Sequence, residues 1–312
     1  MTHAKVIVNP FARGGIAGKR WPHISKLLKD AGVPFDHDFT EGVGHGIELA
    51  REAVAKGYEL VIAVGGDGTV NEVVNGLVDE RGKGRATLGI IITGVGNDVV
   101  RSLGIPRDHA HACRLFSDFK TATIDLGAVE YMRGGEKVRR FFINTSGLGF
   151  DAAVVERTQN LSKAMRSITP YAFGLLLTLA AYRNKEAVID LDGTARAQQA
   201  FLVVVNNGRY FAGGMKITPD ADPCDGFLDA LILGDLSRLE VLWNLRKVYK
   251  GTHLTHPKLR ACQVKAIQIG STERMLLQVD GELVGQAPAS IQVFPAALTV
   301  AVPHDSPLLR LG

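Results

Sequence analysis

Residues 60–78, LVIAVGGDGTVNEVVNGLV, decide the expected fold, because they predict a buried strand, a glycine-rich turn and a helix. Leu60–Val64 is a short apolar run rich in β-branched residues, which is typical of a strand covered on both faces. Gly65–Gly68 frees the backbone for a sharp turn and for the close approach of a ligand. Thr69 and Glu72 fit a capping box that opens the helix. The apolar stripe of this helix consists of Val70, Val73, Val74, Leu77 and Val78.

The glycine turn is expected to bind an anion. A loop that leads into a helix N-terminus directs backbone N–H groups and the positive end of the helix dipole at one point, which suits a phosphate. Asp67 lies among these amides, where its carboxylate would repel a bare phosphate. We therefore expect Asp67 to contact a metal ion that is bound to the phosphates. From the GGDG sequence alone, an ordinary strand–helix connection is an equally good interpretation.

The first 125 residues or so alternate between strand and helix patterns. Further strands are expected at Lys5–Val8, Phe35–Thr40 and Leu88–Thr93, and helices at about Trp21–Ala31, Ile47–Lys56, Asn97–Leu103 and Asp108–Phe119. The alternation predicts a doubly wound α/β domain with a mostly parallel sheet. Ligands bind such sheets beyond the carboxyl ends of the strands. The loops expected there are Asn9–Gly15, Gly65–Gly68 and Gly94–Asn97, so Asp67 and Asp98 could face one pocket.

Composition limits the class of protein. A chain of 312 residues exceeds the usual size of one hydrophobic core, so two domains are expected. A net charge of +4 is compatible with anionic substrates or a membrane surface but is too weak to indicate nucleic acid. The three cysteines are widely spaced, which argues against a disulfide framework or a zinc site. Without a signal peptide or a convincing transmembrane segment, we expect a cytoplasmic protein that is at most peripheral to a membrane.

The pattern changes after Ile124, where short apolar runs alternate with glycine and charge. This half is expected to be predominantly antiparallel β, and residues 188–207 are expected to form two strands, one on each side of a turn at Asp192-Gly193. Three helices are expected near Ala152–Met165, Ala172–Arg183 and Leu239–Tyr249. The predicted domains are residues 1–125 and 126–302, followed by a tail at 303–312.

Two acidic motifs in this half could carry chemistry. In the stretch Thr218–Phe227, Asp220, Asp222 and Asp225 could supply oxygen ligands to Mg²⁺ or Ca²⁺, although a turn between strands is the favoured interpretation. Asp280-Gly281-Glu282 reads first as the turn of a hairpin. A glutamate at that edge could also serve as a general base.

The order of five motifs resembles a known family. These are VNP at 8–10, GGDGTVNE at 65–72, GVGND at 94–98, DGF at 225–227 and DGE at 280–282. Together they resemble the bacterial diacylglycerol and lipid kinases, which are related to sphingosine kinases. GGDGT alone is weak, because NAD kinases and phosphofructokinases carry similar loops. Asn71-Glu72, the GVGND element and the late DGE make the resemblance specific, and it spans nearly the whole chain.

The resemblance implies a nucleotide-binding α/β domain, a β-sandwich-like second domain and an active site between them that uses ATP and Mg²⁺. Asp67 and Asp98 would take part in the Mg²⁺ network, and Glu282 would accept the proton of a lipid hydroxyl. A structural Mg²⁺ would take the Asp225 carboxylate and the carbonyls of Asp222 and Phe227. The tail would pack on the first domain. The ATP site would be lined by Asn9, Pro10, Phe11, Ala12, Arg13, Thr40, Gly66, Asp67, Gly68, Thr69, Val70, Asn71, Glu72 and Thr93.

The chain departs from the family pattern at two loops. Phe11-Ala12-Arg13 delays the first glycine to Gly14, and Val95 and Val99 replace a usual threonine and aromatic. Two alternatives therefore stay open: a different small-molecule kinase of the NAD kinase type, and a nucleotide-binding regulator without enzymatic activity. The expected partners are a lipid alcohol and a membrane surface, and two copies could pair through an exposed edge strand. Ala172–Tyr182 could line the lipid site or touch the membrane, although an ordinary core helix is the favoured interpretation.

Overall fold

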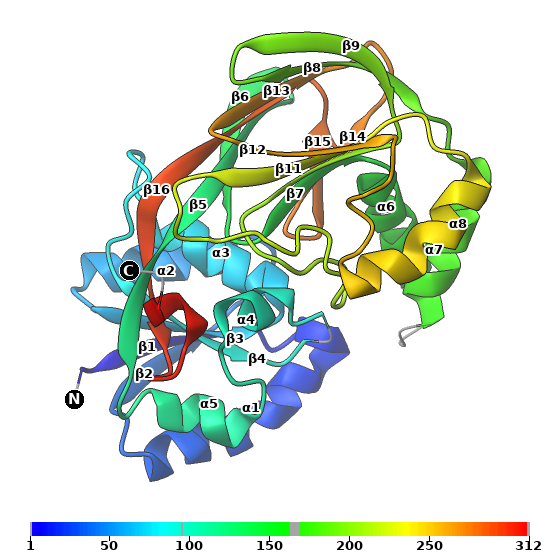
Figure 1. The fold of residues 1–312 in the computed structure, drawn as a ribbon. Coiled ribbons are helices and arrows are strands. Elements are labelled where there is room, and N and C mark those ends of the chain that lie inside the picture. The colour runs from blue at the N-terminus through cyan, green and yellow to red at the C-terminus, as the bar shows by residue number, and fades with distance from the viewer. Residues whose placement is uncertain (1, 95, 163–168, 311–312) are drawn as a thin grey trace.

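The computed structural model describes residues 2–94, 96–162 and 169–310 of the chain. Figure 1 shows two halves, with an α/β layer structure in the lower half and stacked β-sheets in the upper half. The long strands β5 and β16 run from one half into the other.

The first half contains a parallel sheet with the strand order β2-β1-β3-β4. Its strands are β1 (Ala4–Val8), β2 (Phe35–Phe39), β3 (Leu60–Gly65) and β4 (Thr87–Ile92). Its helices are α1 (Ala12–Asp30), α2 (His45–Ala55), α3 (Asp67–Leu77), α4 (Asp98–Leu103) and α5 (His109–Leu115). The predicted doubly wound α/β arrangement is confirmed.

Strand β1 shows why the central strands of this sheet are mostly apolar. Ile7 packs into a core that includes residues of α2, α3 and α4. Val6 and Val8, on the opposite side of the strand, pack into a second core with Trp21 and Ile24 of α1. Because successive side chains of a strand point to opposite faces, a sheet covered on both faces needs apolar residues at every position.

Two local predictions in this half are wrong. Helix α1 begins at Ala12 rather than Trp21, after which Arg13–Gly15 adopt left-handed conformations within the helical segment. The predicted capping box at Thr69 does not form, because Gly66 is the N-cap residue of α3 and Thr69 lies inside the helix. The Thr69 hydroxyl instead accepts a hydrogen bond from Asn9 Nδ2 at 3.0 Å.

The second half is a sandwich of two largely antiparallel sheets around one apolar core. Its strands are β5 (Lys120–Arg133), β6 (Glu136–Phe142), β7 (Thr145–Gly149), β8 (Lys185–Leu191), β9 (Thr194–Ala200), β10 (Leu202–Asn206), β11 (Leu228–Leu233), β12 (Leu259–Val264), β13 (Ala266–Gly270), β14 (Leu276–Val279), β15 (Glu282–Gln286) and β16 (Ala289–Val302). The predicted β-sandwich is confirmed. Residues 188–207 form three strands rather than two, because the chain leaves β9 and enters the other sheet as β10.

Three helices, α6 (Phe150–Ser162), α7 (Thr169–Ala181) and α8 (Arg238–Lys250), lie together beside the sandwich (Figure 1). Residues 163–165 of the expected helix Ala152–Met165 lie outside the described residues. Within the described part of the chain, no helix combines the length and the apolar character needed to cross a membrane.

The two halves are joined by continuous strands. Strand β16 pairs with β4 of the first half at Val300 and Leu88, and along its length with β5. The expected domain boundary at residue 125 thus falls inside β5. The division into domains of residues 1–125 and 126–302 stays a prediction. In the tail, Ser306 Oγ donates a hydrogen bond to the Leu103 carbonyl, and Leu308 is buried in the core of the first half.

Candidate active site between the two halves

Three loops meet at the carboxyl edge of the parallel sheet, as the sequence predicts. The Asn9 side chain ties the first loop to the first turn of α3, since its Nδ2 donates to the Thr69 hydroxyl. Its Oδ1 accepts a hydrogen bond from the Phe11 N–H at 3.0 Å within the first loop. The second and third loops are close enough that a Cβ atom on Gly94 would lie 3.2 Å from Gly66 Cα. A side chain at Gly94 would therefore push the two loops apart.

The third loop brings two buried carboxylates together. A Cβ atom on Gly96 would lie 2.8 Å from Asp67 Oδ2 and 3.9 Å from Asp98 Oδ2. Burial, with added repulsion from Asp98 and Asp280, raises the pKa of Asp67 to about 7. Burial also raises the pKa of Asp98, whose Oδ2 accepts a hydrogen bond from the Gly213 N–H at 2.7 Å. The structure thus places Asp67 and Asp98 on either side of Gly96, and their shared role in a ligand site stays a prediction.

Polar atoms without a hydrogen-bond partner gather around this pair. Four such buried atoms are Asp67 Oδ1, Asp98 Oδ1, Asn97 Oδ1 and Thr93 Oγ1. A buried polar atom without a partner is costly, so such a group points to a ligand. Mg²⁺ typically takes one or two carboxylates together with water and substrate phosphates. The residues at this edge therefore fit a nucleotide-bound Mg²⁺, whereas a cage of three or more His, Cys, Asp or Glu side chains is absent from the described residues.

Glu282 approaches the glycine turn from the second half of the molecule. The Asp280-Gly281 turn places it, with positive φ values of 45° and 82° that fit the predicted hairpin turn. A Cβ atom on Gly68 would lie 2.7 Å from Glu282 Oε1, so the absence of a side chain at Gly68 leaves room for the glutamate. Burial raises the pKa of Glu282, and the Arg140 guanidinium acts in the opposite direction.

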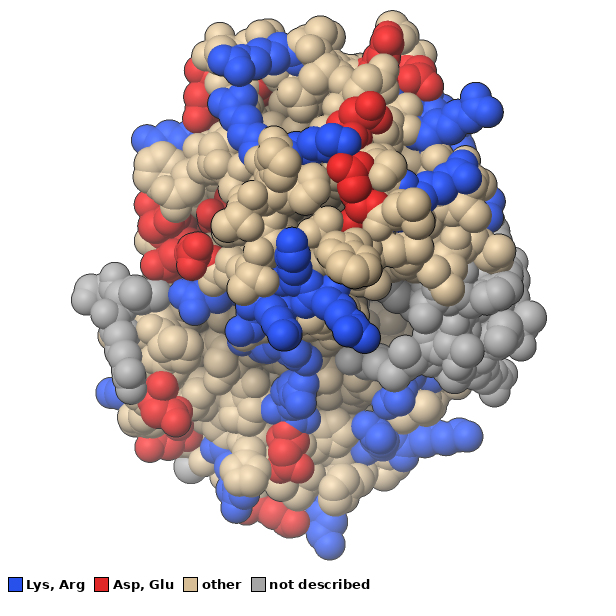
Figure 2. All heavy atoms as spheres, turned by 45° about the vertical axis from the view of Figure 1, so that its right-hand side comes forward, with Lys and Arg blue, Asp and Glu red and all other residues tan. Residues whose placement is uncertain are grey.

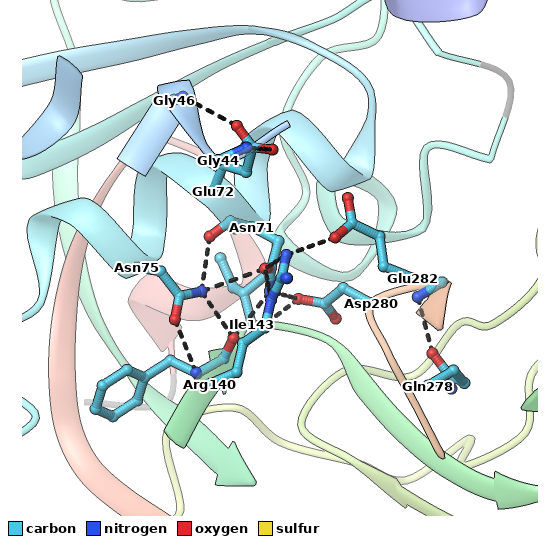
Figure 3. A network of polar contacts seen from close by, with 12 residues as sticks. Gly44, Gly46, Asn71, Glu72, Asn75, Arg140, Ile143, Gln278, Asp280 and Glu282 are labelled. Carbon is cyan, nitrogen blue, oxygen red and sulfur yellow. Dashed lines mark hydrogen bonds and ion pairs between the residues drawn. The ribbon is translucent and has the colours of Figure 1, made fainter. Parts of the chain in front are cut away.

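A polar network holds Glu282 in place (Figure 3). Arg140 Nη2 donates to Glu282 Oε2 at 2.6 Å and to Asn71 Oδ1 at 2.7 Å. Asn71 Nδ2 donates to Asp280 Oδ2 at 2.7 Å, and Asp280 also accepts from the N–H groups of residues 143–145. The network joins α3 to β6 and to the hairpin that carries Glu282. Arg140 was not predicted from the sequence. The one sequence feature that could have pointed to such a partner is Asn71, a polar residue between apolar positions of a buried helix.

Other predicted ATP-site residues have structural contacts of their own. Glu72 accepts hydrogen bonds from the N–H groups of Gly44 and Gly46, at 2.8 and 3.0 Å, and so satisfies the first turn of α2 (Figure 3). The Val70 side chain is fully buried in the core. Thr40 is buried at the end of β2, where its N–H donates to the Val8 carbonyl. In the first loop, Pro10 and Ala12 are partly buried, and Phe11 and Arg13 are exposed.

The acidic turn Thr218–Phe227 is built differently. Asp225 Oδ1 accepts from the Phe227 N–H at 2.9 Å, and Oδ2 accepts from Gln263 Nε2 at 2.7 Å. Asp222 Oδ1 accepts from the Cys224 N–H at 3.0 Å. Nearby, Asp125 accepts from the N–H groups of Gly226 and Ala296, which fastens the turn to β5 and β16. Both Asp225 oxygens thus already have protein partners, and the cation predicted here stays a prediction.

Both halves of the chain match known protein families. Residues 3–129 match the diacylglycerol kinase catalytic domain, and residues 144–302 match the YegS C-terminal NAD kinase beta sandwich-like domain. The chain is 30% identical to a diacylglycerol kinase of Staphylococcus haemolyticus over 304 residues, which cover 97% of this chain and 88% of that protein.

Solved structures agree with these matches. A candidate diacylglycerol kinase from Bacillus anthracis superposes with a TM-score of 0.76 at 25% identity, covering 97% of this chain and 98% of that one. A yeast NADH kinase shares the fold with a TM-score of 0.53 at 12% identity, covering 97% of this chain and 83% of that one. The family matches and the staphylococcal relative support a kinase, and the yeast structure shows the shared fold alone.

Proposed function

Because the chain belongs to the bacterial diacylglycerol kinase family, we propose that it transfers the γ-phosphoryl group of ATP to the hydroxyl of a lipid such as diacylglycerol. The observation that supports this most is that carboxylates from both halves of the molecule lie around the Gly65–Gly68 turn. Asp67 and Asp98 lie on the first half with unpartnered oxygens, and Glu282 reaches the same turn from the second half.

The first half would hold the nucleotide. Backbone N–H groups at the start of α3 suit the phosphates, because they carry the positive end of the helix dipole. Asp67 and Asp98 would bind Mg²⁺, which when bound offsets the negative charge that develops on the transferred phosphoryl group. The two carboxylates are buried and held by the loops before the ligand arrives, so little reorganisation is needed on binding.

The second half would activate the acceptor. Arg140 holds Glu282 Oε2, so we assign Oε1, which faces Gly68, to the hydroxyl proton. Ionised Glu282 would accept that proton while the hydroxyl oxygen attacks the γ-phosphorus atom of ATP, whose bond to the bridging oxygen of the β-phosphate breaks and releases ADP. Phosphoryl transfer depends mainly on position and charge. The network of Asn71, Asp280 and Arg140 supplies position, since it fixes Glu282 relative to α3.

The lipid acceptor implies where the protein works. It would be a peripheral membrane protein, because its acceptor resides in a bilayer. The structural Mg²⁺ that the family resemblance implies at Asp222–Phe227 has no part in the proposed phosphoryl transfer, and the variant Asp225→Asn tests whether it binds there.

The decisive experiment offers several acceptors to the purified chain. Labelled ATP and Mg²⁺ are incubated with a short-chain diacylglycerol, with other lipid alcohols and with NAD, and the labelled product is identified. We expect label in the lipid fraction for the wild-type chain and an initial rate lower by about a hundredfold or more for Glu282→Gln. Label on NAD alone would replace the proposal with an NAD kinase. ATP binding without transfer to any acceptor would indicate a regulator.

A further inference from the structure

Helix α8 lies on the surface, and none of its 13 residues is fully buried. Its ends are well capped, because Ser237 and Glu240 form a capping box and Gly251 closes the C-terminus in a left-handed conformation. Its inner side packs Val241 and Val248 against the apolar core between α6 and the sheet, and its outer side remains available for another role.

The outer face of α8 is apolar at its start and basic at its end. Leu239 and Trp243 are 78% and 82% exposed, and their spacing of four residues puts them on one face of the helix. Leu242 and Tyr249 are also exposed. Large apolar side chains that gather on a surface mark a site of interaction. The basic residues that follow them are Arg246, Lys247 and Lys250.

The end of helix α7 adjoins this face. A groove lined by Tyr182, Arg183, Asp235 and Leu239, among others, joins the segment after α7 to the start of α8. On α7 itself, Leu176 is 52% exposed. The acidic Glu240 is paired with Lys258 at 2.9 Å, so it adds little free negative charge. In Figure 2, which turns the right-hand side of Figure 1 toward the viewer, Lys and Arg side chains gather near the middle of the view.

We propose that the outer face of α8 docks the protein on an anionic lipid bilayer, with Leu239 and Trp243 as apolar anchors and the following basic residues as charges. Helices of this kind lie in the membrane interface, with Trp and Leu among the headgroups and Lys and Arg attracted to anionic lipids. A second copy of the chain is a poor occupant, because two such faces would bring like charges together. The inference rests on the proposed function, since a lipid acceptor would place the enzyme at a bilayer.

A short segment connects α8 to the acidic pair. The N–H of Lys216 donates to the Val248 carbonyl at the end of α8, and three residues earlier the Gly213 N–H donates to Asp98 Oδ2. The docking face thus lies one short segment away from the candidate active site. Binding through α8 would bring the site close to the bilayer that contains the acceptor.

Tryptophan fluorescence tests the docking directly, without nucleotide. The chain has two tryptophans, of which Trp21 is 6% exposed and Trp243 is 82% exposed, so a change in polarity on binding reports on Trp243. The protein is mixed with vesicles of phosphatidylcholine, with and without phosphatidylglycerol. We expect a blue shift and co-sedimentation with the anionic vesicles only, and no shift for Trp243→Phe. Sedimentation without a change in Trp243 emission would overturn the proposal.

Charge variants test the electrostatic part. Each Lys or Arg near an anionic leaflet strengthens binding about fivefold. Arg246→Glu with Lys250→Glu should therefore weaken vesicle binding at least about tenfold. The matched control is Lys26→Glu with Lys29→Glu, which makes the same change of charge on the exposed side of α1. Equal losses in both pairs would mean that overall charge, and not α8, directs binding.

Apolar variants test the anchors and separate this inference from the proposed function. Leu239→Ser with Trp243→Ser should abolish vesicle binding, whereas Met132→Ser with Val188→Ser, at exposed apolar positions of the sandwich, should not. The α8 variant should still phosphorylate a dispersed short-chain diacylglycerol at the wild-type rate. If neither the wild-type chain nor the variants phosphorylate that acceptor, the proposed function fails. Vesicle binding by the same proteins still decides whether α8 docks on the membrane. A blue shift that depends on protein concentration in the absence of vesicles would indicate a second copy instead.

Discussion

The acidic pair Asp67 and Asp98 and the acidic turn Asp222–Asp225 place the same kind of side chain in two environments. In the pair, each carboxylate is buried and has one oxygen without a hydrogen-bond partner. In the turn, both oxygens of Asp225 accept hydrogen bonds from protein groups. The residue types and the neighbouring glycines are alike, but only the first arrangement buries carboxylate oxygens that have no hydrogen-bond partner among the described residues.

The difference shows how to recognise a carboxylate that acts on a ligand. An aspartate in a turn accepts hydrogen bonds from nearby backbone N–H groups, so its role is structural and needs no ligand. A buried aspartate with an unpartnered oxygen is costly to the fold, so the cost points to a ligand that offsets it. The predictions below test this contrast from the strongest expected effect to the weakest.

Asp67→Asn should have the largest effect. Removing the carboxylate that faces the nucleotide-bound metal should lower kcat by about 10³-fold or more, because such charge stabilisation is worth several kcal/mol. The same variant should raise the melting temperature in the absence of Mg²⁺, since it removes a buried charge. Initial rates over a Mg²⁺ titration, together with thermal unfolding in EDTA, measure both effects. An unchanged Mg²⁺ dependence would contradict the assignment.

Glu282→Gln should lower kcat by about 10²–10⁴-fold, which is the usual contribution of a general base. ATP binding should be retained, because Glu282 belongs to the acceptor side of the site. Titration of the variant with ATP measures the binding, and a single-turnover assay measures the transfer. Turnover at the wild-type rate would remove Glu282 from the mechanism.

The sequence predicts much of this site, and the reasons are local. The strand–turn–helix pattern at 60–78 places Asp67, and the parallel sheet then requires the loop with Asp98 to lie at the same edge. Arg140 could not be found in this way, because its partners Asn71 and Glu282 are 69 and 142 residues away along the chain. The capping box at Thr69 failed because α3 begins at Asp67, with Gly66 as its N-cap residue, so Thr69 lies inside the helix.

Arg140→Gln should shift the pH dependence of turnover. Glu282 must be ionised to accept a proton, burial raises its pKa, and the positive charge of Arg140 counteracts this rise. Without that charge the pKa of Glu282 rises further, so activity should be lost at a higher pH as the solution is acidified. We also expect a fall in kcat of about tenfold from the lost positioning.

The control for Arg140 is its neighbour on β6. Arg139 pairs with Glu130 at 2.6 Å on the exposed side of the strand, so Arg139→Gln should leave the pH profile unchanged. Arg140→Lys retains a positive charge and should restore part of the profile. A drop in rate that is equal at every pH would mean that Arg140 only supports the fold.

Asp225→Asn should have the smallest effect on catalysis. Its oxygens stabilise a turn, so we expect kcat to change by no more than about threefold and the free energy of unfolding to fall by about 1 kcal/mol, the net value of a typical hydrogen bond. The loss should be the same in Mg²⁺ and in EDTA, because protein groups already satisfy the carboxylate. If the loss appears only in Mg²⁺, the turn binds the second cation that the family resemblance implies. Partnered oxygens would then be no guide to whether a carboxylate binds metal, and the contrast with Asp67 would rest on burial alone.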